Sequence, residues 1–329
     1  MVWDRVRVSL GSAVVLGLMQ GKVDVMPTTL YLMTYHPGKC DANCAFCPQA
    51  RTSEGRADML SRITWPSFPT KGVLSGIKRA SSSALMKRIC IQAIRYDGVF
   101  EDVVGLITEL KRHTDLPISV CCQPLDEDRI GELAEIGVDR ICFALDAATE
   151  ELFDRVKGRG VDGPYVWRNH IKALRSAIRT FGRWRVTTHI IAGLGENDEE
   201  LVRLIQRLVD MGVYPALFAF TPIPGTMLGD RPQPSLSRYR RIQIARYAIT
   251  RGETRYEKMR FGDEGRIIGF GIPSEELRRI VETGEPFLTS GCPGCNRPFY
   301  NERPGGPIYN YPRRPTMREV LRIEEEVGL

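Results

Sequence analysis

Short apolar runs alternate with longer amphipathic stretches through the first two thirds of the chain. The apolar, β-branched runs predict six strands, at residues 29–35, 87–94, 117–122, 139–145, 185–193 and 214–220. Helical spacing of apolar residues between these runs predicts helices at residues 99–113, 126–137, 165–182 and 196–212. Strand–helix alternation of this length predicts an α/β fold with a parallel sheet and right-handed crossovers.

Six strand–helix units are too few for a closed eight-stranded barrel, so the pattern predicts a partial (βα)6 TIM-type barrel. In such folds the chemistry gathers at the carboxyl ends of the strands. The segments that directly follow the six strands are residues 36–47, 95–98, Cys121–Cys122, Asp146, residues 193–196 and residues 221–226. We therefore expect these segments to face one mouth of the barrel.

The segments on either side of the barrel predict three parts, residues 1–28, 29–230 and 231–329. The apolar run from Ser9 to Met19 is too short to span a membrane, and Asp4 does not fit a signal peptide. We interpret the run as an amphipathic helix capped by Ser9 and ended by Gly21, in a cytoplasmic protein that does not bind membranes.

Turn-forming residues dominate two further segments. Residues 51–72 predict a loop over the mouth, and residues 290–315 form a tail rich in proline and glycine. Between them, helices are predicted at residues 235–251 and 274–283. The third part is thus a C-terminal extension, and its tail carries a CxxC motif.

The composition is that of a globular protein, and it excludes some classes of function. Of the 329 residues 43% are hydrophobic and 26% are charged. The net charge of +6 is dispersed, without the basic stripe and interleaved aromatics of a nucleic-acid-binding protein. It fits an acidic partner or an anionic cofactor, although a solvated surface is the simpler explanation. Nine cysteines in a cytoplasmic protein are more often metal ligands, redox groups or buried residues than disulfides.

Three of the cysteines, Cys40, Cys44 and Cys47, lie together after the first predicted strand, in "CDANCAFC". Three thiolates can bind three irons of a [4Fe–4S] cluster and leave the fourth iron open, whereas a ferredoxin uses four cysteines. The alternative is a zinc site, for which His36 is the local candidate for a fourth ligand. An open iron is useful where a second molecule must bind it and receive an electron.

This spacing, with Phe46 before the last cysteine, resembles the CxxxCxxC motif of the radical S-adenosylmethionine (SAM) superfamily. The resemblance implies that SAM binds the open iron and that electron transfer, from a reductant such as ferredoxin or flavodoxin, cleaves its sulfonium bond. The product is a 5′-deoxyadenosyl radical that abstracts hydrogen from an unactivated carbon. In such an enzyme the cofactor carries the chemistry, and the protein positions the reactants and excludes water.

The same resemblance implies further SAM contacts at the other strand ends. Asp146 is expected to accept hydrogen bonds from the ribose, and "GLGE" is expected to bring Gly193, Gly195 and Glu196 near SAM. Two further segments would contact the amino group and the adenine, through Asp97, Gly98 and Pro224. Each segment alone also fits a turn or a helix start, and for Asp97 alone that interpretation is preferred.

A second set of cysteines lies on the second and third strands. Residues 30–225 resemble biotin synthase, whose auxiliary cluster has cysteine ligands on these strands, here matched by Cys90 and by Cys121 or Cys122. The chain has Thr187 and His189 where biotin synthase has a further ligand cysteine before "GLGE". It also has Cys142 and Ala144 where biotin synthase has substrate-binding asparagines, which argues against dethiobiotin as the substrate. For Cys142 we favour ordinary core packing.

The tail motif of Cys292 and Cys295 is the remaining pair of thiols. We expect it to fold over the barrel mouth and to complete an auxiliary iron–sulfur cluster with Cys90 and one of Cys121 and Cys122. A zinc or structural role for the CxxC is the alternative.

The tail "SGCPGCNRPFYNERPGG" resembles the two-component lipoyl synthases of archaea, a family that adds sulfur to a protein-bound octanoyl chain. The resemblance implies a sulfurtransferase with a second radical SAM subunit and an octanoylated lipoyl carrier protein, docked by the arginines Arg297, Arg303, Arg313 and Arg314. The single-chain lipoyl synthase is excluded, since its N-terminal cysteine motif and C-terminal RSSY are missing. The alternatives are a radical SAM enzyme of another type, such as a biotin synthase-like enzyme or a methylase with a redox cluster, and a non-catalytic iron–sulfur or zinc protein.

Overall fold

The computed structural model describes residues 4–302 and 305–329. Its centre is a sheet of eight strands in the order β10-β9-β8-β7-β6-β2-β1-β5. The six predicted strands are all present and pair in parallel: β2 (Thr29–Met33), β6 (Arg88–Gln92), β7 (Ile118–Cys122), β8 (Arg140–Phe143), β9 (Val186–Ala192) and β10 (Val213–Ala219). The predicted α/β class and the partial barrel are confirmed.

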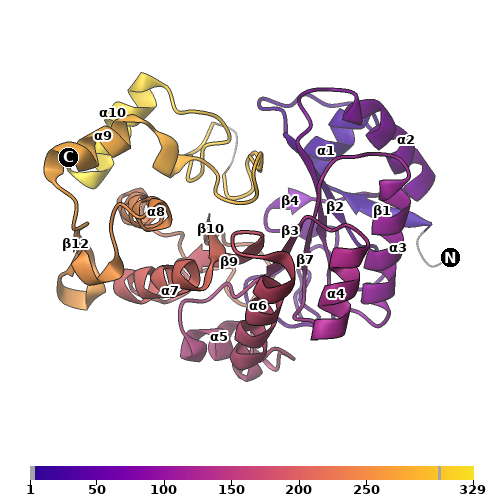
Figure 1. Cartoon of the computed structure of the whole chain (residues 1–329), viewed down its shortest axis with the longest axis horizontal. Coiled ribbons are helices and arrows are strands. Elements are labelled where there is room, and N and C mark those ends of the chain that lie inside the picture. Colours follow the sequence, from indigo (N-terminus) through magenta and orange to yellow (C-terminus); the bar gives the residue numbers. More distant parts are fainter. Residues whose placement is uncertain (1–3, 303–304) are drawn as a thin grey trace.

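Helices cover the outside of this curved sheet (Figure 1). They are α2 (Thr70–Ser81), α3 (Val99–Lys111), α4 (Glu127–Glu135), α5 (Glu150–Val156), α6 (Trp167–Phe181) and α7 (Asp198–Met211). The four predicted crossover helices match α3, α4, α6 and α7, with ends at most two residues inside the predicted bounds. Helix α2 was not predicted, because its two glycines and three serines or threonines among twelve residues weaken the helical pattern.

The segments before β2 and after it differ from the prediction. Residues 9–21 contain only the short helix α1 (Leu10–Val15), and a strand β1 (Arg5–Val8) precedes it. β1 pairs antiparallel with β2 and with β5 (Ser67–Pro69), so its backbone groups are satisfied on both sides. The predicted loop at 51–72 contains β5 and the hairpin of β3 (Met59–Leu60) and β4 (Ile63–Thr64).

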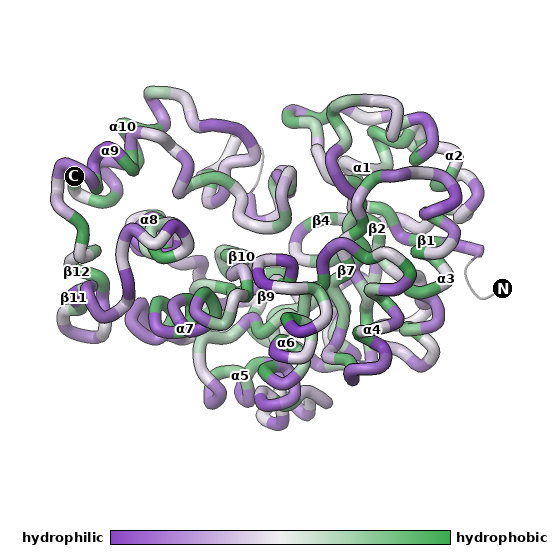
Figure 2. Tube along the Cα trace, viewed as in Figure 1, coloured by the Kyte–Doolittle hydropathy of each residue, from purple (hydrophilic) through white to green (hydrophobic). Residues whose placement is uncertain are grey.

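The hydrophobic core lies between the sheet and the helices. Leu30, Leu32, Ile89 and Ile91 on β2 and β6 are fully buried. Parallel strands covered by helices carry nearly continuous apolar runs, and Figure 2 shows this hydrophobic colouring along β2 and β7. No helix among residues 4–302 and 305–329 is long and apolar enough to cross a membrane.

The C-terminal extension forms a second group of elements beside β10 (Figure 1). Its elements are α8 (Leu236–Arg251), β11 (Arg260–Phe261), β12 (Ile267–Gly269), α9 (Ser274–Glu282) and α10 (Met317–Val327). The predicted helices at 235–251 and 274–283 are confirmed as α8 and α9, whereas α10 was not predicted.

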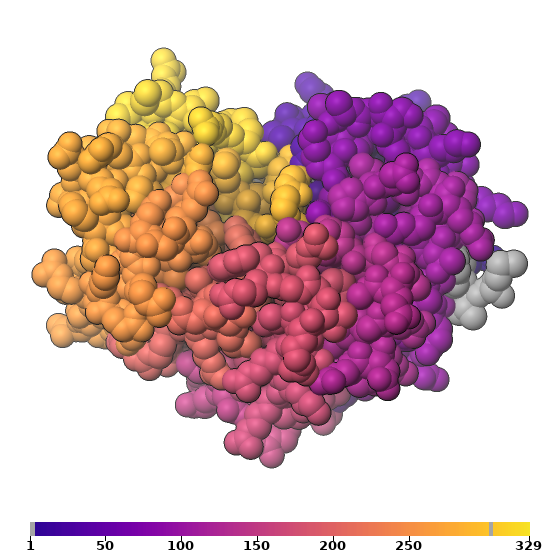
Figure 3. Space-filling view, in the orientation of Figure 1, coloured from indigo at the N-terminus to yellow at the C-terminus, as the bar shows by residue number. Residues whose placement is uncertain are grey.

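The tail between α9 and α10 fills the open side of the partial barrel. On one side, Ser290 Oγ accepts the backbone N–H of Leu217 at 2.8 Å and Asn301 donates to the carbonyl of Ala219 at 2.9 Å, both on the free edge of β10. On the other side, the backbone N–H of Arg297 donates to the hydroxyl of Tyr31 on β2 at 2.9 Å. Figure 3 shows this segment between the two halves of the molecule. The tail therefore connects the free edge of β10 with the side chain of Tyr31 on β2, across the open side of the barrel.

Candidate active site

All nine cysteines border one cavity inside the barrel, with a volume of about 280 Å³. They come from the loop after β2, from β6, β7 and β8, and from the tail: Cys40, Cys44, Cys47, Cys90, Cys121, Cys122, Cys142, Cys292 and Cys295. All nine thiols are free. Residues up to 255 positions apart in the sequence thus contribute sulfur to a single enclosed space.

The loop of Cys40, Cys44 and Cys47 lies at the carboxyl end of β2, as predicted. The sulfur of Cys40 accepts backbone N–H groups from Arg95 at 3.2 Å, directly after β6, and from Ala42 at 3.4 Å. Amides that point at sulfur stabilise the negative charge of an iron–sulfur site. Phe46 lines the same cavity. Three inward thiols with amide donors are a donor set that fits a [4Fe–4S] cluster with one open iron.

Burial keeps these thiols protonated while no metal is bound. It raises the pKa of Cys44 well above the usual value and that of Cys47 to about 12. Metal binding requires thiolates, so a bound cluster must supply the positive charge that displaces the protons. The sulfurs of Cys40, Cys44 and Cys47 do not all lie within 4.8 Å of one another. The ligands of a single zinc ion do lie that close together. His36 stacks on Tyr96 instead of facing the cavity, which argues further against the zinc alternative.

Asp146 lines the cavity at the end of β8, but its carboxylate already has a partner. Lys157, which follows α5, places its ammonium 2.6 Å from the Asp146 carboxylate and 2.5 Å from the carbonyl of Ala144. Both side chains are at least 90% buried. Burial alone lowers the pKa of Lys157, but the charges of Asp146 and Cys44 raise it above the usual value. The sequence analysis missed Lys157, because a lysine at a helix C-terminus normally faces solvent.

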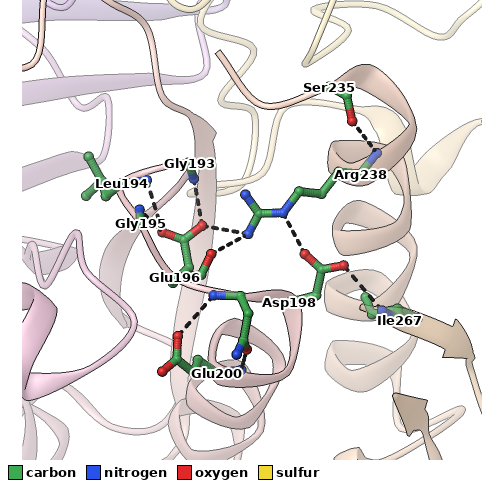
Figure 4. Close-up of polar contacts among 10 residues, drawn as sticks. Gly193, Leu194, Gly195, Glu196, Asp198, Glu200, Ser235, Arg238 and Ile267 are labelled. Carbon is green, nitrogen blue, oxygen red and sulfur yellow. Dashed lines mark hydrogen bonds and ion pairs between the residues drawn. The ribbon is translucent and has the colours of Figure 1, made fainter. Parts of the chain in front are cut away.

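The "GLGE" loop after β9 is held together by its own glutamate (Figure 4). The Glu196 carboxylate accepts the backbone N–H groups of Gly193 at 2.7 Å, Leu194 at 3.0 Å and Gly195 at 3.1 Å. Arg238 of α8 pairs with the same carboxylate at 2.9 Å. The two glycines have φ angles of +109° and +136°, which permit this wrapped backbone. The three residues predicted to contact SAM here do not line the cavity, and Glu196 instead shapes the loop.

Replacing Glu196 with glutamine is expected to destabilise the fold by roughly 1.5–3 kcal/mol, since the hydrogen bonds to this charged group weaken. The measurement is the free energy of unfolding in urea. Glu132→Gln on the exposed face of α4 is the matched control, with a change below about 0.5 kcal/mol. An equal loss in both variants would show that Glu196 does not hold this loop.

Three other residues predicted to contact SAM lie outside the cavity. Asp97 and Gly98 are exposed at the start of α3 and line a separate surface hollow with Arg129. Pro224 is exposed and lies against the segment at 53–55, where Gly225 accepts the N–H of Glu54. From the same two strand ends, Arg95 and Thr221 reach the cavity instead. The rule that functional residues follow the strands identified these segments, but it did not predict which of their side chains point into the cavity.

The CxxC lies at the end of the barrel opposite the one expected. Ser119, near the start of β7, donates to the sulfur of Cys292 at 3.3 Å. Gly294 accepts the hydroxyl of Thr28, directly before β2, at 2.5 Å. Both contacts are at the amino ends of the parallel strands, so the prediction that the motif covers the mouth is wrong. The tail enters through the open side of the barrel and reaches the cavity at the amino ends of the strands.

The remaining cysteines divide into two groups inside the barrel. Cys90 is half-buried near Cys292 and Cys295, whose charges, after desolvation, are the largest causes that raise its pKa. Cys121 instead lies beside Cys142 on the neighbouring strand, and their register pairs them directly. Cys122 packs against the hydrophobic core. Cys142 is buried, as predicted, but it faces Cys121 and His189 and not an apolar neighbourhood.

The pKa values of Cys121 and Cys142 are shifted in opposite directions. The hydrogen bond to Cys142, followed by burial, raises the pKa of Cys121 well above its usual value. Burial alone would raise the pKa of Cys142, but hydrogen bonds from Cys121, His189 and Thr187 lower it well below that value. The hydrogen bond between the two thiols thus acts on their pKa values in opposite directions.

The four tail arginines predicted to dock a carrier protein are not equivalent. Arg297 is buried and stacks over Phe218, with its guanidinium carbon 3.8 Å from the ring centre. Arg313 and Arg314 are at the surface, paired with Glu319 and Glu285. Arg303 lies outside the described residues. The docking prediction is thus wrong for Arg297, which lines the cavity.

Comparisons with known proteins agree with this geometry. Biotin synthase from Acidothermus cellulolyticus is 24% identical over 283 residues, covering 79% of this chain and 80% of the relative. The biotin synthase of Synechococcus elongatus is 23% identical, covering 80% of each chain.

Two solved structures share the fold. The structure of methylornithine synthase has a TM-score of 0.53 and 15% identity, over 68% of this chain and 62% of that one. The FeFe-hydrogenase maturase HydG from Carboxydothermus hydrogenoformans has a TM-score of 0.53 and 16% identity, over 69% and 52%. Residues 34–208, which include the Cys40–Cys47 loop and the four parallel strands β6 to β9, match the family described as the radical SAM superfamily. The chain therefore belongs to the radical SAM superfamily, and it is similar to the biotin synthases.

Proposed function

We propose that this enzyme inserts sulfur into unactivated C–H bonds of a protein-bound octanoyl chain, as a component of a lipoyl synthase. The observation that carries the proposal is the single cavity bordered by all nine cysteines, with the SAM-cluster loop at one end and the CxxC at the other. The similarity to biotin synthases supports this proposal.

The chain's own residues fit two clusters at opposite ends of the cavity. Bound there, a SAM-binding [4Fe–4S] cluster supplies the electron that cleaves SAM, and an auxiliary cluster supplies sulfur. Cys40, Cys44 and Cys47 would hold the first, and Cys90, Cys292 and Cys295 the second. Serine and tyrosine hydroxyls lie beside the CxxC sulfurs, since Ser119 donates to Cys292 and Tyr31 lies 3.3 Å from Cys295. Such hydrogen bonds stabilise thiolate ligands.

The cavity also fits an acyl chain as the substrate. Ile191, Phe218 and Phe220 contribute apolar surface between the two groups of cysteines. The tail blocks the open side of the barrel, which excludes water from a radical reaction. Asp146 and Lys157 are the charged pair nearest the Cys40–Cys47 loop, and they would orient the polar groups of SAM at that end.

The proposed partners follow from this substrate. An octanoyl group is carried on a lipoyl carrier protein, and the exposed Arg313 and Arg314 beside α10 would meet its acidic surface. A second radical SAM subunit and a reductant such as ferredoxin or flavodoxin complete the proposed system.

The test is a single incubation of the anaerobically reconstituted chain with SAM, reductant and an octanoylated carrier peptide. The peptide is read by mass, and we expect a gain of sulfur together with a loss of labile sulfide from the protein. In a Cys292→Ser/Cys295→Ser variant, SAM cleavage should continue while sulfur transfer falls to background, and Cys122→Ser is the control. A modified peptide without sulfur would favour a radical SAM reaction of another type.

A further inference from the structure

Three metal-ligating side chains that are not assigned to either cluster site proposed above meet on the wall of the cavity. Cys121, Cys142 and His189 lie on the adjacent strands β7, β8 and β9. Cys121 pairs with Cys142 and Cys142 pairs with Thr187, so that His189 lies two residues further along the same face of β9. All three line the cavity. The parallel register therefore brings two thiols and an imidazole to one level of the barrel.

The spacing of these groups is that of a single ion. Their ligand atoms all lie within 4.8 Å of one another, and no other three such atoms in the described parts of the chain meet this closely. Tetrahedral coordination with bonds of about 2.3 Å to sulfur and 2.0 Å to nitrogen places ligand atoms roughly 3.5–4 Å apart. Small changes of side-chain rotamer would bring ligand atoms that lie within 4.8 Å of one another to this shorter spacing. The sulfurs of an iron–sulfur cluster site are spread more widely, as in the Cys40–Cys47 loop.

We propose that Cys121, Cys142 and His189 bind one thiophilic divalent transition-metal ion, such as Zn²⁺ or Fe²⁺, at a third site in the cavity. Two thiolates neutralise the charge of a divalent ion, so the complex is neutral in its buried surroundings. Three protein ligands leave a fourth position open toward the cavity, as in catalytic metal sites. The site goes beyond the sulfur insertion proposed above and does not depend on it.

The surroundings hold the three ligands in place. The His189 ring packs edge-on against Phe218, with ring centres 4.8 Å apart. Thr187 lies beside Cys142 on the adjacent strand and hydrogen-bonds to it. Residues around the ligands orient them and tune affinity, typically by 10–100-fold. The His189 position also explains why the chain differs here from the cysteine ligand pattern expected for an auxiliary cluster.

The test uses the full chain with the thiols of the other two sites removed: Cys40, Cys44, Cys47, Cys90, Cys292 and Cys295 are replaced with serine. Under anaerobic, reducing conditions and without sulfide, Co²⁺ is titrated and its thiolate-to-metal absorption is followed. We expect one Co²⁺ per chain with a tetrahedral spectrum. Adding Cys142→Ser should weaken binding by at least about 100-fold. His189→Gln should weaken it and change the spectrum.

Cys122→Ser is the control, because Cys122 is the neighbour of a ligand but packs against the core. Circular dichroism reports the fold of each variant, and Cys121→Ser replaces Cys142→Ser if the latter fails to fold. The proposal is overturned if no stoichiometric Co²⁺ binds, or if Cys142→Ser and His189→Gln bind it as tightly as their parent. It is also overturned if, in the otherwise unaltered chain, Cys142→Ser lowers the labile sulfide after reconstitution, since Cys142 would then be a cluster ligand. SAM cleavage is measured separately and does not enter this test.

Discussion

Replacing Cys44 with alanine is expected to reduce the formation of 5′-deoxyadenosine from SAM to background. The side chain is one of three thiols at the carboxyl end of β2, and a [4Fe–4S] cluster with two remaining ligands is not held stably. The loss should exceed the roughly 10–100-fold cost of removing a group that only supports a metal ligand. The measurements are deoxyadenosine release, and iron and labile sulfide per chain after anaerobic reconstitution.

Cys122→Ala is the matched control, because this thiol borders the cavity but pairs in register with the fully buried Phe143, and its side chain alternates with that of Cys121 along β7. It should retain the cluster and SAM cleavage. Cys44→Ala should keep the iron bound at the opposite end of the cavity, so that the iron content falls by about one cluster and not to zero. Full SAM cleavage by Cys44→Ala would disprove the assignment of this loop as the SAM-cluster site.

Replacing Lys157 with methionine is expected to lower the free energy of unfolding by about 3–5 kcal/mol. The side chain of Lys157 is 7% exposed and that of Asp146 is 10% exposed, so the substitution leaves a carboxylate buried without its counter-ion. The Asp146 backbone also has a φ angle of +65°, which the surrounding contacts must maintain. Urea unfolding at neutral pH measures the loss.

A double variant, Lys157→Met with Asp146→Leu, tests how much of the stability comes from the attraction between the two charges and how much from burying the two side chains. Removing both charges together should restore part of the lost stability, because an apolar replacement of a buried pair is often close to neutral. The folded-state pKa of Lys157 is raised, so the contribution of the pair is complete below the unfolded lysine value of 10.5 and is lost as the pH rises through the folded value. Equal losses in the single and double variants would show that the pairing itself does not stabilise the fold.

The order of the elements and one end of the cavity could be predicted from local sequence. Six apolar runs of strand length separated by amphipathic helices admit few arrangements other than a parallel partial barrel. The spacing of Cys40, Cys44 and Cys47 is local too, because three thiols within eight residues meet wherever their loop lies. The barrel rule then places that loop at the carboxyl end of β2.

The side chains that complete the cavity were decided by the tertiary structure. Whether a strand-end residue faces the cavity or solvent depends on one turn of backbone, which is why Asp97 and Gly98 are exposed while Arg95 lines the cavity. Lys157 follows a short helix and becomes buried only because α5 ends against the cavity. Glu196 has the sequence of a cofactor contact, but its loop folds around its own carboxylate.

Contacts between residues far apart in the sequence explain why the position predicted for the CxxC was wrong. The CxxC segment is 173 and 266 residues away in the sequence from the two residues that it contacts, and its own sequence says nothing about which end of the barrel it enters. That choice follows from the unpaired edge of β10, which binds the tail through Ser290 and Asn301. Periodicity and short spacings therefore determined the fold and the first thiol site. The register of neighbouring strands and the path of the tail decided the rest, because backbone groups left unpaired at a sheet edge bind whichever segment reaches them.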